Sequence, residues 1–193
     1  MEWCDLNYFS SSIWYDNICL MREHSSTCVP PLNLVLKPFQ LCPFDKVKVV
    51  LFCTEPPEET SAFVGDPLFP FGTPEMFEAY RKEYPEDVTN PVDLSCWARQ
   101  GVLLLNYTQA LLSEEEMLDS YDLLTDLCKA FHVRKEALAW VSFGSLSFSA
   151  RGEFSFLGSL NKFHVQETPK AAPFQNVNLY LASKGLTPID WRV

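Results

Sequence analysis

The 193-residue chain lacks long hydrophobic runs and a secretion signal. No apolar stretch reaches about 18 residues, the length that a membrane-spanning helix needs. Residues 1–5 have neither the basic start nor the apolar core of a signal peptide. A nuclear or cytoplasmic protein is therefore expected. Hydrophobic residues make up 47% and charged residues 21%, a composition typical of a globular domain rather than a disordered chain.

The chain also lacks any Cys-x-x-Cys pair and is poor in histidine. Its seven cysteines are scattered and odd in number, at positions 4, 19, 28, 42, 53, 96 and 128. Its three histidines, His24, His132 and His164, are far apart in the sequence. This pattern favours reduced, mostly buried thiols over a disulfide framework or a zinc site. We expect no metal and no cofactor.

Positively charged residues are few, and they outnumber negatively charged residues only near the carboxyl-terminal end. The net charge is −10, and residues 129–193 hold eight Lys and Arg against four Asp and Glu, or +4, so residues 1–128 carry −14. Because DNA affinity depends on neutralising phosphates, this balance opposes tight binding and points any DNA contact to the carboxyl-terminal third. The acidic part is either a solvated surface or a face for a protein partner.

Strand-like and helix-like segments alternate along the chain. Apolar, β-branched runs predict strands at 46–53, 101–106, 138–143 and 162–167, and helical spacing predicts helices at 74–84, 117–131 and 174–184. A Ser-x-x-Glu capping pattern at 113–116 precedes the second of these helices. The alternation predicts a three-layer α/β/α domain around a four-stranded, mainly parallel sheet. We expect this domain to span 29–193, with 1–28 as a helical or irregular cover.

The carboxyl ends of the predicted strands mark the default ligand site. The loops 54–59, 144–149 and 168–173, together with the segment after Asn106, would meet at that edge of the sheet. Asn106 is a single polar residue at the exit of an otherwise apolar strand. It is either a turn residue that ends the strand or an amide aimed at a ligand.

Five segments in order carry a resemblance to a known family. They are Pro30-Pro31, the run into the first strand at 43–50, the Trp-Ala-x-Gln-Gly-Val-Leu-Leu-Leu-Asn run at 97–106, Gly144-Ser145, and the Pro-Ile-Asp-Trp terminus at 188–191. From about residue 29 onward the chain resembles the family-1 uracil-DNA glycosylases. The resemblance implies their fold and, as an expectation, a role in DNA repair.

The first catalytic loop of that family departs from its pattern here. The family reads Gly-Gln-Asp-Pro-Tyr-His where this chain has 53–58, and only the proline is kept. Glu55 stands at the position of the Asp that activates water, but its extra methylene moves the carboxylate by about 1 Å, which can cost ~10²-fold in rate. Pro57 replaces the Tyr that excludes 5-methyl groups, so the base pocket would be more open.

The second loop departs as well. The family's His-Pro-Ser-Pro-Leu-Ser corresponds to 168–173. Thr168 replaces the His that stabilises charge on the departing uracil, and losing such a donor costs ~10²–10³-fold. His164 lies inside the predicted strand and is no obvious substitute. Ala172 or Pro173 stands near the position of the Leu that fills the gap left by a flipped base.

Some binding residues remain. Asn106 matches the family Asn that reads the uracil edge. Phe69, with Leu68 as its rival, stands near the Phe that stacks on the base, although packing in the core is an alternative. The resemblance assigns DNA contact to the residues Pro30, Pro31, Gly144, Ser145, Pro169 and Lys170.

Two functional hypotheses follow. In the first, the chain has lost efficient uracil excision and serves as a DNA- or protein-binding module in repair or replication. In the second, it is an active glycosylase in which Glu55 activates water and Pro57 admits 5-substituted pyrimidines. A third and weaker idea is an acidic decoy that contacts DNA-binding proteins.

Overall fold

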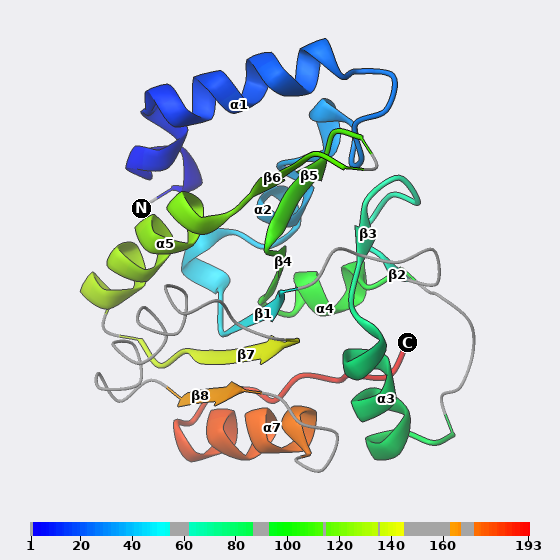
Figure 1. Cartoon of the computed structure of the whole chain (residues 1–193). Coiled ribbons are helices and arrows are strands. Elements are labelled where there is room, and N and C mark those ends of the chain that lie inside the picture. Colours follow the sequence, from blue (N-terminus) through cyan, green and yellow to red (C-terminus); the bar gives the residue numbers. More distant parts are fainter. Residues whose placement is uncertain are drawn as a thin grey trace.

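A four-stranded parallel sheet lies at the centre of the fold (Figure 1). Its strands, in spatial order, are β4 (Val102–Asn106), β1 (Val49–Cys53), β7 (Ala139–Phe143) and β8 (Phe163–Gln166). Every neighbouring pair is parallel. The computed structural model describes residues 2–54, 62–86, 93–113, 115–134, 136–144, 163–166 and 172–193. All four predicted strands are present, each beginning one to three residues later than its sequence pattern indicates.

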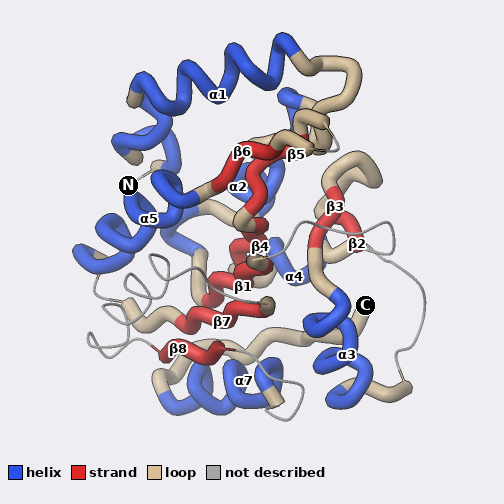
Figure 2. Tube along the Cα trace, viewed as in Figure 1, coloured by secondary structure: helices blue, strands red, loops and turns tan. Residues whose placement is uncertain are grey.

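Helices cover both faces of this sheet, because its strands are apolar on both sides. All five residues of β1, β4 and β7 are buried. Trp140 packs edge-on against Phe131 of α5 (Tyr121–Val133), whereas Phe143 stacks on Phe174 of α7 (Pro173–Ser183). Side chains three apart on a strand point to opposite faces, so α5 and α7 lie on opposite sides, with the sheet between them (Figures 1 and 2). The predicted three-layer α/β/α class is confirmed.

The carboxyl-terminal segment is fastened to two helices, α3 (Pro74–Glu83) and α4 (Ser95–Arg99). The Trp191 carbonyl accepts hydrogen bonds from Trp97 Nε1 at 2.8 Å and from the Tyr80 hydroxyl at 3.0 Å. The Gln100 side chain donates to the Asp190 carbonyl at 2.9 Å and accepts from the Asp190 amide at 2.8 Å. The tail thus runs along one face of the domain as part of the core.

Residues before the sheet form a series of helices. They are η1 (Trp3–Asp5), η2 (Asn7–Ser10), α1 (Ser12–Glu23), η3 (Leu32–Leu34), α2 (Lys37–Leu41) and η4 (Phe44–Lys46). Met21 of α1 packs in a second small core with Ala110 and Leu112. Leu6 and Tyr8, in contrast, belong to the main core. The amino-terminal segment therefore covers the domain through two separate apolar contacts.

The helix predicted to include Met117 begins later than expected. A hairpin of β5 (Thr108–Leu111) and β6 (Met117–Asp119) occupies this stretch, and α5 begins at Tyr121. Ser113 Oγ does accept the backbone amide of Glu116 at 3.1 Å, but that contact closes the hairpin turn instead of starting a helix. Met117 lies on β6 and is 50% exposed. Its prediction as a helix core residue is wrong, because the same capping chemistry serves both turns and helices.

A second hairpin, β2 (Ala62–Phe63) with β3 (Pro70–Phe71), was not predicted. Asp93 fixes it against the start of α4. Its carboxylate accepts from the Gly65 amide at 2.8 Å, the Ser95 amide at 2.9 Å and the Ser95 hydroxyl at 2.8 Å. Partial burial alone would raise the pKa of Asp93, but these hydrogen bonds outweigh it and lower that pKa. The carboxylate is therefore held in its charged form.

Two glycines with positive φ give a matched test of this packing. Gly101 has φ +98, and an added Cβ would collide with the Lys46 carbonyl oxygen. Gly185 has φ +70 with nothing within 4 Å of an added Cβ. We expect Gly185→Ala to lower the free energy of unfolding by about 1 kcal/mol and Gly101→Ala by about 3 kcal/mol or more. Urea unfolding measures both, and equal losses would contradict the close approach at Gly101.

Asp93→Asn should destabilise the fold in a pH-dependent way. At pH 7 we expect a loss of about 1–2 kcal/mol from the weakened hydrogen bonds. Because the pKa of Asp93 is lowered in the fold, its stabilisation is present above the unfolded pKa near 3.8 and is lost as the pH falls through the lowered value. The difference in free energy of unfolding between wild type and Asp93→Asn, measured by urea unfolding, should therefore disappear in strong acid. Asp66→Asn, in the β2–β3 loop, is the control, and a difference between wild type and Asp93→Asn that does not change with pH would refute the assignment.

Candidate functional site

Three strands of the sheet end at the same level. Cys53, at the end of β1, pairs with Asn106 of β4 on one side and with Phe143 of β7 on the other. The chain segments that follow these three residues therefore leave from one edge of the sheet, as predicted. Gly144 follows β7 directly and has φ +86, a backbone conformation that glycine adopts readily.

Asn106 is held in place from two sides. Its Nδ2 donates to the Pro70 carbonyl of β3 at 3.0 Å, and its backbone carbonyl accepts from the Ser120 hydroxyl at 3.0 Å. The residue is 9% exposed. Its Oδ1 is buried and has no hydrogen-bond partner among the described residues. Asn106 thus presents a fixed amide whose acceptor oxygen is unsatisfied.

No sequence pattern indicated the two residues that hold Asn106. Pro70 acts through its backbone carbonyl, which any residue would supply, so no side-chain pattern could reveal it. Ser120 is 4% exposed and precedes α5. A polar residue at a helix start is normally interpreted as a cap, but Ser120 makes no side-chain cap bond and donates to Asn106 instead.

Phe69 lies next to this site but within the core. It immediately precedes Pro70, is 6% exposed and belongs to the main hydrophobic cluster. Leu68, its rival for a base-stacking role, is 59% exposed. Packing in the core therefore accounts for the position of the Phe69 ring. A role in stacking on a base stays a prediction.

The two predicted DNA-contact prolines lie beside the β5–β6 hairpin. The Val29–Pro30 peptide bond is cis, and Val29 exchanges two backbone hydrogen bonds with Leu111 of β5, each 2.8 Å long. Pro30 is buried and Pro31 is half-buried. Because β5 follows Asn106 with one residue between, these prolines are joined to the segment that leaves the strand edge. Their contact with DNA stays a prediction.

Several predicted site residues lie outside the described part of the chain. These are Glu55, Pro57, Ser145, Thr168, Pro169 and Lys170. The second-loop positions Ala172 and Pro173 are described, as the N-cap and first residue of α7. His164 lies within β8, opposite Trp140, as its predicted strand position requires.

The described residues contain no cluster of three or more His, Cys, Asp or Glu that could hold a metal ion. No helix among them is long and apolar enough to span a membrane. All seven cysteines fall within the described ranges, and no disulfide joins any of them. Cys28, Cys42, Cys53 and Cys128 are buried, and burial raises the pKa of Cys42 to about 12. The prediction of mostly buried thiols is confirmed.

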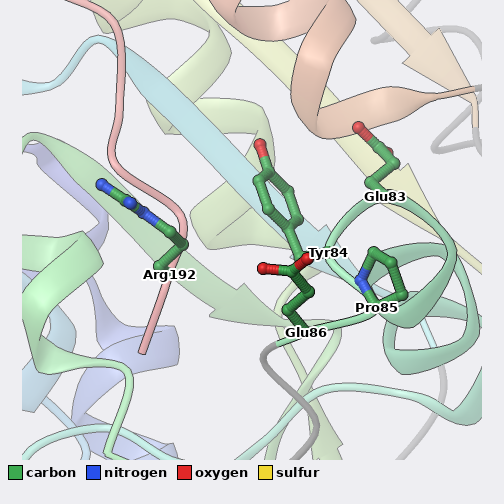
Figure 3. A pocket seen from close by; sticks show the side chains of 5 residues that line it. All are labelled: Glu83, Tyr84, Pro85, Glu86 and Arg192. Atoms are coloured by element: carbon green, nitrogen blue, oxygen red, sulfur yellow. The ribbon is translucent and has the colours of Figure 1, made fainter.

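A pocket of about 410 Å³ opens elsewhere, at the end of α3 and the carboxyl-terminal tail (Figure 3). Its lining residues are Glu83, Tyr84, Pro85, Glu86 and Arg192. Arg192 is paired with Asp190 through Nε and Nη2, both at 2.8 Å. None of these residues was predicted as part of a site, since charged residues at a helix end suggest only a solvated surface.

Known proteins provide an independent comparison. No family model matches the chain. A uracil-DNA glycosylase of Campylobacter fetus is 31% identical over 185 residues, covering 84% of this chain and 78% of that protein. The uracil-DNA glycosylase 2 of Bacteroides fragilis is 30% identical over 189 residues, covering 84% of this chain and 82% of that protein.

A solved structure agrees with these sequence relatives in fold. The crystal structure of mimivirus uracil-DNA glycosylase superposes with a TM-score of 0.74 at 14% identity, covering 99% of this chain and 86% of that one. Two relatives at 30% identity or more match most of their own length, and the fold is that of the solved structure. The chain belongs to the uracil-DNA glycosylase family.

Proposed function

We propose that this protein recognises a uracil-type base in DNA through Asn106 and excises it far more slowly than relatives with complete catalytic loops. The observation that carries the proposal is the buried Asn106 Oδ1, which has no hydrogen-bond partner among the described residues. A buried acceptor without a donor costs about 1–3 kcal/mol. A ligand N–H placed against it would recover that cost.

The orientation of the amide selects the kind of base. The Pro70 carbonyl can only accept a hydrogen bond, so the amide nitrogen of Asn106 must face it and the oxygen must face the other way. The oxygen can then accept the N3–H of uracil or thymine while the second amide N–H donates to O4. Cytosine presents the reverse pair, an acceptor at N3 and a donor at N4. The site therefore favours uracil and thymine over cytosine.

The residue types in the two catalytic loops support slow chemistry. Thr168, in place of the family's His, is a shorter and weaker donor toward charge on the leaving base, and one lost donor costs ~10²–10³-fold. Glu55, in place of Asp, displaces the carboxylate, and a displacement of about 1 Å can cost ~10²-fold. We therefore expect base recognition to be retained better than base cleavage.

The distribution of charged residues supports weak binding to the DNA backbone. Residues 1–128 carry −14 and residues 129–193 carry +4, so few cations are available to neutralise phosphates. Recognition would then depend on the base more than on the backbone, and a protein partner in repair or replication would help to deliver the DNA. The acidic surface of the first two-thirds is the candidate face for that partner.

Asn106→Ala should abolish base discrimination. The test is fluorescence anisotropy with single-stranded oligonucleotides that carry one hydrolysis-resistant 2′-fluorinated deoxyuridine or one deoxycytidine. We expect wild type to prefer the uracil strand and Asn106→Ala to lose about 10-fold of that preference, as removal of one buried hydrogen-bond pair implies. Asn33→Ala, at an exposed asparagine, is the control. A preference unchanged in Asn106→Ala would refute the proposal.

A second candidate, an active glycosylase for 5-substituted pyrimidines, rests on the retained carboxylate at Glu55 beside the small Pro57. The test is base release from single-stranded DNA carrying uracil, thymine or 5-hydroxymethyluracil. We expect little release by wild type at high protein concentration. Efficient release that falls about 10²-fold or more in Glu55→Gln, but not in the neighbouring Glu58→Gln, would replace our proposal with this second function.

A further inference from the structure

Helix α7 begins without a cap of its own. Its N-cap residue is Ala172, which has no side-chain acceptor, and Pro173 occupies the first helical position and lacks an N–H. The first intrahelical bond joins the Asn176 amide to the Ala172 carbonyl at 2.9 Å. The backbone amides of Phe174 and Gln175 therefore need acceptors from elsewhere in the fold.

Glu83, the last residue of α3, supplies both acceptors. Its Oε1 accepts the Phe174 amide at 3.1 Å, and its Oε2 accepts the Gln175 amide at 2.7 Å. The two partners lie 91 and 92 residues further along the chain. In the close view, Glu83 points toward α7, away from Arg192 on the terminal tail (Figure 3). One carboxylate thus joins the end of α3 to the first turn of α7.

This arrangement is not explained by the needs of α3. A negative charge at the carboxyl end of a helix opposes the helix dipole, whereas the same charge at the amino end of α7 is favourable. Burial raises the pKa of Glu83, although the hydrogen bonds from Gln175 and Phe174 act in the other direction. A raised pKa means that the ionised form is disfavoured in the fold, so this contribution to stability is lost as the pH rises through that pKa. Ionisation of Glu83 is therefore not itself a source of stability at neutral pH, and what the side chain contributes there is its two hydrogen bonds to α7.

What Glu83 does fix is the place where α7 begins. The segment 168–172 ends at Ala172, one residue before α7, and it corresponds to the second catalytic loop of the family. We propose that Glu83 is a positioning residue, which anchors the first turn of α7 and thereby fixes Ala172 and Pro173, the described end of the second-loop segment. The inference rests on the proposed function, because it assumes that the loop contacts a base or its phosphates. A displacement of about 1 Å there would cost up to ~10²-fold.

The experiment compares Glu83→Ala and Glu83→Gln with Glu86→Ala, an exposed acid that lines the same pocket. Amide hydrogen exchange measured by mass spectrometry reports on peptides spanning 173–177 and, as a reference, on β1. Anisotropy with the 2′-fluorinated deoxyuridine strand reports on affinity, and urea unfolding reports on the fold.

In Glu83→Ala we expect about 10-fold faster exchange at 173–177, unchanged exchange in β1, and about 10-fold weaker binding to the uracil strand. Glu83→Gln keeps one acceptor oxygen, so it should restore part of the affinity and should fold even if Glu83→Ala does not. Glu86→Ala should match wild type in both measurements.

Three results would overturn the inference. They are unchanged exchange at 173–177, faster exchange with wild-type affinity, and an affinity loss that Glu86→Ala shares. Failure of the proposed function looks different, because wild type itself would then bind the uracil and cytosine strands equally. In that case the exchange data alone decide whether Glu83 anchors α7.

Discussion

The packing around Trp191 is the constraint on which one whole face of the domain depends. Its ring is 1% exposed and lies edge-on to Trp97 at 5.2 Å and to Phe174 at 5.0 Å between ring centroids. Its carbonyl accepts from α3 and α4, and its Nε1 donates to the Phe174 carbonyl of α7 at 3.2 Å. Three helices distant in sequence therefore meet on one residue of the terminal tail. Removing any of these partners would leave buried polar groups unsatisfied.

This constraint explains why the resemblance to the family is strong in some segments and absent in others. Trp97 and Gln100 of the 97–106 run contact the carboxyl-terminal segment, so their match to the family reflects the scaffold. Asn106, at the end of the same run, is the exception, because its side chain does not contact that segment. Trp97, Tyr80 and Phe174, which contact Trp191, lie outside the sequence segments 53–58 and 168–173, where this chain departs from the catalytic motifs of the family. A match in the packed residues is therefore evidence for the fold, and activity must be argued separately.

The sequence was most informative where local chemistry and burial agree. The apolar runs predicted β1, β4 and β7, and helical spacing predicted α3. The start of α3 is capped locally, since Thr73 Oγ1 accepts the Met76 amide at 3.3 Å. Prediction failed where one pattern serves two structures, as with Ser113, or where the partner is distant. Neither the Pro70 carbonyl near Asn106 nor the α7 amides near Glu83 leave a mark in the local sequence, because those contacts exist only once the chain has folded.

The same distinction separates base recognition from base removal. Asn106 sits at the end of a buried strand, and its amide is oriented by a backbone carbonyl, so its specificity belongs to the rigid sheet and not to a loop. The proposed acid and donor for cleavage, Glu55 and Thr168, differ in residue type from the Asp and His of the family, and each change would slow cleavage. Under our proposal, the chain therefore keeps base recognition while its cleavage chemistry is weakened. Glu83 extends that logic, since it links the end of α3 to the first turn of α7, the helix that follows the second-loop segment.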